Sequence, residues 1–181
     1  MKRRTIKDVF IVLCCGALFY FCLISCNNSN SVEPEDYGYG DDYMIYSKVL
    51  SETIMQENIL IILNDSTEQE NFIKDNFEYF FEKFPDANRE TLENYIIANQ
   101  STIKLKRIPG IEFVFKSDYD ESTGNKVNVY LSNVGYNSNK TEAFVSMGAS
   151  YAPLVGSGSL IFLVKINNQW QIKKSVMTWI S

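Results

Sequence analysis

The chain of 181 residues carries 17 basic and 22 acidic side chains, a net charge of −5, and its aromatic residues are 12 Phe, 11 Tyr and 2 Trp. The acidic balance argues against nucleic-acid binding, because an acidic surface repels phosphate. Histidine is absent from the sequence, which excludes histidine-based metal sites, Ser-His and Cys-His nucleophilic systems and histidine acid–base catalysis. The aromatic content predicts a folded domain with a core of large side chains.

The chain begins with a basic segment followed by an apolar run. Lys2, Arg3, Arg4 and Lys7 precede Val9–Ile24, which contains no charged residue. The 16 residues of this run match the hydrophobic region of a secretory signal peptide. They fall short of the roughly 20 residues that a membrane-spanning helix requires. Because positive charge stays on the cytoplasmic side, the rest of the chain is expected outside the cytoplasm.

The end of this run, Leu23-Ile24-Ser25-Cys26, resembles the lipobox of bacterial lipoproteins. The resemblance implies that a diacylglycerol group is attached to the Cys26 thiol, that a peptidase cuts before Cys26, and that the new amino terminus is usually acylated as well. We therefore expect a lipoprotein of the bacterial cell envelope, bound to the membrane through Cys26. The alternative is an uncleaved signal anchor, in which Val9–Cys26 forms a short, tilted transmembrane helix.

Three parts of the chain are expected: a signal peptide over residues 1–25, an acidic polar tether over 26–42, and one globular domain over 43–181. The tether contains too few apolar residues to offset the entropy of ordering it. Its acidic part, Glu33–Asp36, is alternatively a sorting signal for export machinery. Cleavage before Cys26 would leave 13 basic and 21 acidic residues, a net charge of −8, and a single cysteine, so no disulfide is possible within the mature chain.

The first half of the domain has helical periodicity, interrupted by one strand. Apolar residues recur at spacings of three and four over Tyr43–Glu57, and Asp41 or Asp42 is the expected cap of this helix. The aliphatic run Ile59–Leu63 is too short for a helix and predicts a strand covered on both faces.

Two more helices are predicted. Ser66 to Gln69 fits a capping box before a helix that stops at Pro85. Its apolar stripe consists of Ile73, Phe77, Phe80, Phe81 and Phe84. Such a stripe could line an apolar ligand groove, but core packing is the commoner role. A third helix is expected over Asn88–Asn99.

After Asn99 the apolar period changes from about 3.6 to 2, which predicts strands. The runs are Ile103–Leu105, Ile111–Phe115, Val127–Leu131, Ala143–Met147, Leu160–Ile166 and Trp170–Trp179. Short polar turns between several of them predict an antiparallel meander. The expected fold class is α+β, a single domain whose N-terminal helices pack on one face of a curved antiparallel sheet. The final hairpin, in which Asn167-Asn168-Gln169 precedes Trp170, resembles that of NTF2-like and cystatin-like domains.

Two groups of acidic residues are candidates for chemistry. Asp118, Asp120 and Glu121 suggest a calcium loop, but Thr123 stands where an EF-hand needs Gly and Val129 where it needs an acid, so a solvated hairpin loop is preferred. The second group is Asp65, Glu68 and Glu70. A carboxylate pair could cleave a glycoside, although these residues are expected to stabilise a helix N-terminus instead.

The segment Gly156–Ser159 lacks the lysine and the following helix of a phosphate-binding loop, so it is interpreted as a flexible connection or a bulge before a strand. Tyr136, Tyr151 and Trp179 are expected beside these glycines, where they would suit sugar or peptide binding or would fill the end of the sheet. The sequence predicts no catalytic residue, cofactor or metal ligand, and Cys26 is its one assigned site. The predicted function is a non-catalytic domain that binds a protein, peptide or small molecule, or inhibits an enzyme. A carboxylate-dependent glycan hydrolase is the alternative.

Overall fold

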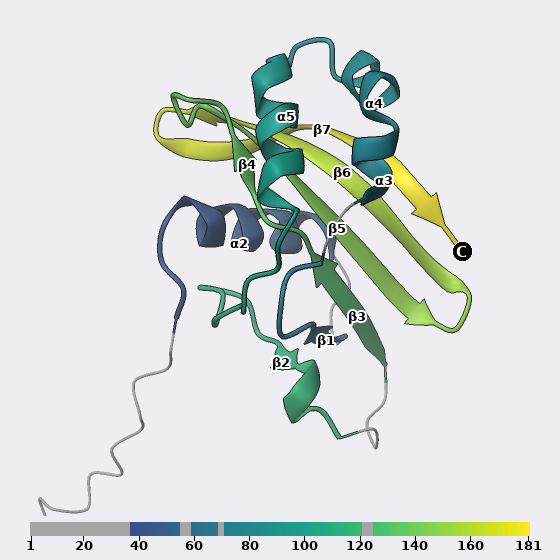
Figure 1. Ribbon diagram of the computed structural model, residues 1–181. Coiled ribbons are helices and arrows are strands. Elements are labelled where there is room, and N and C mark those ends of the chain that lie inside the picture. The colour runs from purple at the N-terminus through teal and green to yellow at the C-terminus, as the bar shows by residue number, and fades with distance from the viewer. Residues whose placement is uncertain (1–36, 55–58, 69–70, 121–124) are drawn as a thin grey trace, which may run out of the picture. The chain divides into compact units, whose positions relative to one another are not determined.

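The structure, a computed structural model, describes residues 37–54, 59–68, 71–120 and 125–181, in which most helices precede most strands along the chain (Figure 1). Within these ranges four α-helices accompany a seven-stranded mixed sheet. They belong to one compact unit over Asp36–Ser181. The α+β class and the single domain are therefore confirmed.

The strands lie side by side in the order β2-β1-β3-β5-β6-β7, and β4 pairs with β5. Their bounds are β1 Leu60–Leu63, β2 Val114–Phe115, β3 Lys126–Leu131, β4 Gly135–Tyr136, β5 Glu142–Ala152, β6 Val155–Ile166 and β7 Gln169–Ile180. The pairs from β3 to β7 are antiparallel, as predicted, but β1 runs parallel to both β2 and β3. The chain returns from β1 to β2 through three helices, a connection long enough for parallel pairing.

The final hairpin has the predicted turn. Asn167 and Asn168 have φ values of 49° and 64°, the left-handed conformation that a two-residue type I′ turn requires. Asparagine tolerates this conformation better than most residues. The turn brings β6 and β7 together along most of their length. Gly156–Ser159 lies inside β6 and does not form a connection before it, but the register with β7 shifts between Gly158 and Ser159, as the alternative prediction of a bulge implies.

The helices are α2 Asp41–Thr53, α3 Asn71–Asp75, α4 Phe77–Lys83 and α5 Arg89–Ala98. The single helix predicted before Pro85 is two helices, because Asn76 has φ −120° and ψ 33° and its side chain donates a hydrogen bond to the carbonyl of Phe72. The predicted cap Ser66 instead pairs with Lys104 in an antiparallel bridge, and Gln69 lies outside the described residues.

Helix α5 lies where it was expected. The first turn of this helix donates hydrogen bonds to Glu142 at the start of β5. The carboxylate of Glu142 accepts hydrogen bonds from the Asn88 backbone N–H at 2.9 Å and the Thr91 hydroxyl at 2.8 Å. These bonds satisfy a donor at the helix start that has no partner within the helix. Helix α2 begins two residues earlier than expected, with Gly40 as its cap, so Asp41 and Asp42 occupy its first turn.

Helices pack on both faces of the sheet, so the prediction of one covered face is wrong. Ala143 and Val145 of β5 belong to the same core as Ile45 and Val49 of α2. The residue between them, Phe144, packs in a second core with the residues of α4 and α5. Successive residues of a strand point to opposite faces, so α2 and the pair α4–α5 cover different faces. Strands buried on both sides need continuous apolar runs, which β5 has.

The strands near β2 are shorter than predicted. The domain begins earlier in the chain than the predicted residue 43. Of the runs Ile103–Leu105 and Ile111–Phe115, only Val114–Phe115 is a strand, and a 3-10 helix follows it directly. Tyr37 already pairs with Arg107, so residues 37–42 belong to the domain and not to the tether. Because β1 lies between β2 and β3, the acidic loop after Asp118 does not close a hairpin.

The described residues contain no helix that is long and apolar enough to cross a membrane. The predicted signal peptide and the predicted attachment residue Cys26 lie outside the described residues.

Candidate functional site

A groove of about 550 Å³ opens beside the N-terminal half of α2. It runs between this helix, the turn at Pro109 and the turn between β6 and β7. Tyr39, Tyr43, Met44 and Trp170 give it an aromatic and apolar lining. Its volume falls in the range of roughly 300 to 1,000 Å³ that is usual for small-molecule sites.

The wall formed by Tyr43 is fixed in place. A Cβ atom on Gly38 would lie 2.0 Å from the Tyr43 ring, so only glycine lets the chain pass this close. The Tyr43 hydroxyl accepts a hydrogen bond from the Lys106 backbone N–H at 3.0 Å, and the ring meets Tyr46 edge to face. Tyr39, on the outer rim, is 84% exposed and is available for contact.

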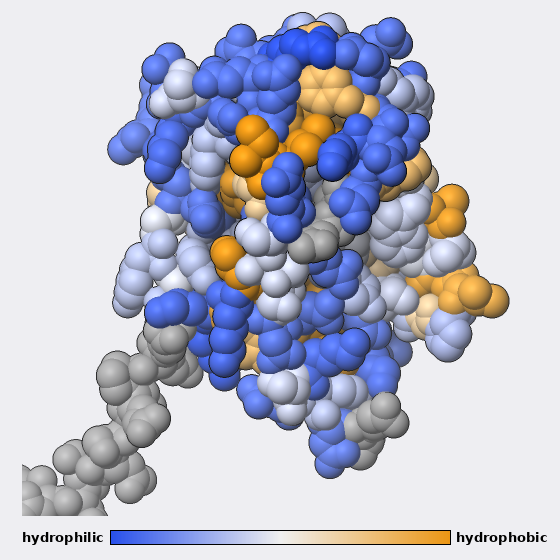
Figure 2. Space-filling model, viewed as in Figure 1, coloured by the Kyte–Doolittle hydropathy of each residue, from blue (hydrophilic) through white to orange (hydrophobic). Residues whose placement is uncertain are grey.

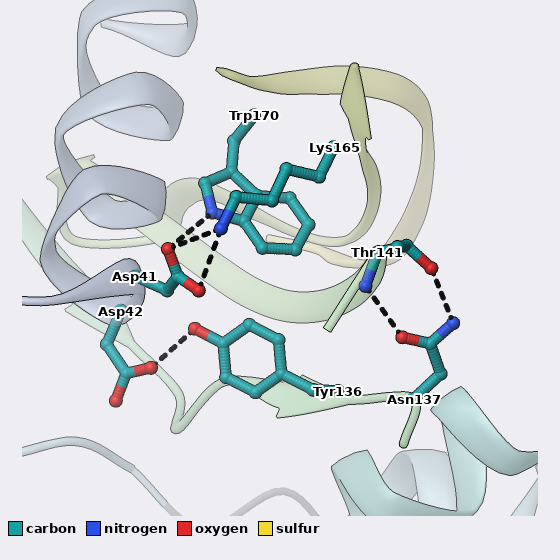
Figure 3. Close-up of polar contacts among 7 residues, drawn as sticks. All are labelled: Asp41, Asp42, Tyr136, Asn137, Thr141, Lys165 and Trp170. Carbon is teal, nitrogen blue, oxygen red and sulfur yellow. Dashed lines mark hydrogen bonds and ion pairs between the residues drawn. The ribbon is translucent and has the colours of Figure 1, made fainter. Parts of the chain in front are cut away.

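A polar cluster behind the groove ties α2 to the last hairpin (Figure 3). The Asp41 carboxylate accepts hydrogen bonds from Lys165 Nζ at 2.9 Å and from the Trp170 indole Nε1 at 3.3 Å. Burial raises the pKa of Asp41, but the hydrogen bonds from Lys165 and Trp170 and the positive charge of Lys165 outweigh it, so this pKa lies below its ordinary value. Asp41 is therefore ionised at neutral pH and anchors the helix.

Tyr136 occupies the other side of this cluster. Its hydroxyl donates a hydrogen bond to Asp42, and its ring lies 5.8 Å from that of Trp170 (Figure 3). Burial, followed by the hydrogen bond and negative charge of Asp42, raises the pKa of Tyr136 well above its usual range. Tyr136 thus remains a protonated hydrogen-bond donor at neutral pH.

The structure separates the three aromatic residues that the sequence placed together. Tyr136 lies in the polar cluster, whereas Trp179 lies near the far end of β7, against Gly158. Tyr151 is 41% exposed near the C-terminal end of strand β5. The role of Asp41 could not be predicted from the sequence, because its partners Lys165 and Trp170 are 124 and 129 residues away and no local spacing connects them.

Two of the acidic candidates, Asp65 and Glu68, have structural partners, whereas Glu70 and Glu121 lie outside the described residues. Asp65 accepts hydrogen bonds from the backbone and the hydroxyl of Ser117, in the 3-10 helix Lys116–Asp118, and not from the helix that was predicted to follow it in the chain. Glu68 accepts one from Asn64 at 3.0 Å, and burial raises its pKa despite the opposing effects of Lys116 and Asn64. In the part of the chain that the structure describes, no group of three or more Asp, Glu, Cys or His side chains could hold a metal ion.

The geometry of the groove and of the polar cluster is the basis for assigning a function. The similarity of the final hairpin to NTF2-like and cystatin-like domains stays a prediction. The chain matches no protein-family model, no curated protein and no solved structure.

Proposed function

We propose that the protein is a bacterial cell-envelope lipoprotein, anchored through a lipid on Cys26, whose domain binds a small molecule or peptide outside the cytoplasm without catalysis. The observation that carries the binding role is the groove of about 550 Å³ beside α2, with its aromatic lining.

The groups beside the groove suit binding better than acid–base chemistry. A general acid or base works best with a pKa near the operating pH. Asp41 has a lowered pKa and is held by Lys165, while Tyr136 has a strongly raised pKa and donates to Asp42. Both side chains therefore stabilise the wall of the groove and are poorly suited to exchange protons with a ligand.

The proposed anchor is strong enough to hold the domain by itself. A single myristoyl chain gives only marginal membrane binding, whereas two chains anchor stably at about 0.8 kcal/mol per buried methylene. A diacylglyceryl group on Cys26 would supply two chains. The mature chain, with its net charge of −8, would need no basic surface to assist it.

The intact mass of the detergent-extracted full-length protein tests the anchor. We expect a chain that begins at Cys26 and is heavier by a diacylglyceryl or triacyl group. Cys26→Ala should abolish this modification, whereas the matched variant Cys22→Ala, within the apolar run, should retain it. An unmodified wild-type chain that still carries the first residues would show that Val9–Cys26 is a signal anchor.

Filling the groove tests the binding role. Ser47 lines the groove, so Ser47→Trp should block it, whereas Ser175→Trp on the exposed part of β7 is a matched control. In a soluble chain lacking residues 1–26, we expect the neutral probe Nile red to bind the wild type and Ser175→Trp but not Ser47→Trp. Equal binding by all three chains, with unchanged melting temperatures, would contradict the proposal.

A further inference from the structure

One row across the sheet consists of two aromatic residues and two glycines. Pairing sets Tyr130 of β3 opposite Gly148 of β5, Gly148 opposite Gly158 of β6, and Gly158 opposite Trp179 of β7. We call these four residues the aromatic shelf. Paired residues share a face, and Gly148 is an even number of positions from Phe144, so the shelf lies on the face covered by α4 and α5.

The indole of Trp179 lies directly on the glycines. A Cβ atom on Gly158 would be 2.0 Å from Nε1, and one on Gly156 would be 3.2 Å from Cζ3. A Cβ atom on Gly148 would be 3.0 Å from Cζ2 and 3.5 Å from the ring of Tyr130. Atoms of both indole rings thus touch the strands, so one side of the indole rests on the main chain.

The other side of the indole is open. Trp179 is 41% exposed although three glycines cover one side of it. In Figure 1 the hairpin end of β5 and β6 extends beyond α3, α4 and α5. Figure 2 shows hydrophobic side chains at the edge of the molecule where Figure 1 places the C-terminus and this hairpin, in keeping with exposures of 87% for Leu154 and 73% for Ile180. An aromatic ring fixed on one side and open on the other is a platform for stacking.

Strands β5 and β6 present polar but uncharged residues beside the shelf. The next row places Asn128 opposite Ser150 and Ser150 opposite Gly156. No charged residue occurs from Ala143 to Val164. A ligand with many hydroxyl or amide groups could hydrogen-bond to such a surface, whereas a phosphate would find no charged partner on β5 or β6.

A small niche adjoins the shelf. It has a volume of about 30 Å³ and is lined by Tyr130, Ser146 and Trp179, among others, with Glu68 at its rim. The Ser146 side chain is 3% exposed, and its hydroxyl oxygen has no hydrogen-bond partner among the described residues. A space of this size accepts one water-sized group. A buried hydroxyl without a partner is costly, so the niche favours a ligand that offers a polar group there.

We infer that the aromatic shelf binds an uncharged saccharide, with a pyranose ring stacked on Trp179 and one hydroxyl group in the niche beside Ser146 and Glu68. A pyranose has a flat face of C–H groups for the indole and hydroxyl groups at its edge for Asn128, Ser150 and the niche. The site is distinct from the groove, because Trp170, which lines the groove, is about 30 Å along the strand from Trp179.

The alternative is that Trp179 only covers exposed glycine backbone. Isothermal titration of the detergent-solubilised full chain with three tetrasaccharides, of β-1,4-linked N-acetylglucosamine, β-1,4-linked glucose and α-1,4-linked glucose, distinguishes the two. We expect at least one to bind with a dissociation constant below about 1 mM. Trp179→Ala should weaken that binding at least about tenfold, about 1.4 kcal/mol, because it removes the ring on which the sugar stacks.

Four further variants keep the test decisive. Ser146→Ala should weaken binding about threefold or more, because it removes the polar group of the niche. Met177→Ala, which changes a side chain that is 57% exposed on the same strand, should leave binding unchanged. If Trp179→Ala does not fold, Trp179→Phe should retain binding that is weaker than wild type. No binding of any of the three sugars, or binding unaffected at Trp179, would overturn the inference. Ser47→Trp should bind the sugars normally, so the groove and the shelf can fail independently.

Discussion

Replacing Trp170 by Ala should cost much of the stability of the domain. Trp170 is 5% exposed, its ring lies 5.8 Å from that of Tyr136, and Lys165 Nζ lies 5.2 Å above it. A buried Trp removes roughly 200 Å² of surface from water, which at about 25 cal/mol per Å² gives about 5 kcal/mol as an upper value. Measured Trp→Ala changes in cores cost about 3 to 5 kcal/mol, and we expect Trp170→Ala to fall in this range.

Urea unfolding followed by circular dichroism measures this loss in a soluble chain that lacks residues 1–26. Trp179→Ala is the matched control, because Trp179 is 41% exposed on the same strand and the same area estimate gives about 3 kcal/mol as its upper value, below that of Trp170→Ala. Trp170→Phe keeps most of the packing but loses the hydrogen bond to Asp41, so about 1 kcal/mol is expected from that bond. A loss below about 1 kcal/mol for Trp170→Ala, or one no larger than for Trp179→Ala, would refute the assignment of Trp170 as the anchor of the hairpin.

The remaining predictions concern pH and a close contact between backbones. Because the pKa of Asp41 is lower in the folded chain, Asp41 stabilises the fold above its unfolded pKa, near 3.8, and this contribution disappears as the pH falls through the folded value. The melting temperature of wild type should therefore fall more between pH 6 and pH 3 than that of Asp41→Asn. The control Asp86→Asn, at an exposed position, should follow wild type. Parallel curves for all three proteins would contradict this reasoning. Gly135→Ala would place a Cβ atom 2.1 Å from the Tyr95 Cα atom, so α5 would have to move away from β4. Urea unfolding should show that the free energy of unfolding falls by about 3 kcal/mol or more. A fall below about 1 kcal/mol would show that the contact is not close.

Elements with local signals were predictable from the sequence. Helix α5 has an apolar stripe that lies within the element itself. The last hairpin has two adjacent Asn residues that tolerate the left-handed conformation of its turn. In each case the residues that decide the structure are neighbours in the chain.

The parts that escaped prediction depend on distant residues. Nothing within Leu60–Leu63 specifies that this strand lies between β2 and β3 or runs parallel to them. The sequence near Asp41 likewise predicts only a helix cap, because its partners Lys165 and Trp170 reach it only in the folded chain. The two-sided burial of β5 did have a signal, because its run from Ala143 to Val145 is apolar at every position, as in strands covered on both faces.

The two tryptophans of β7 show how a cross-strand partner determines the role of a side chain. Trp170 pairs with Lys165, and the charged head of that lysine and Asp41 of α2 enclose the indole. Trp179 pairs with Gly158, which has no side chain to cover the ring or to hold it away from the strand. One indole therefore becomes part of the core while the other lies on the main chain with a side open to solvent. Glycine inside a strand ordinarily weakens the strand. At Gly158 the indole of Trp179 occupies the space that a side chain would take, so the strand continues and its aromatic surface is retained.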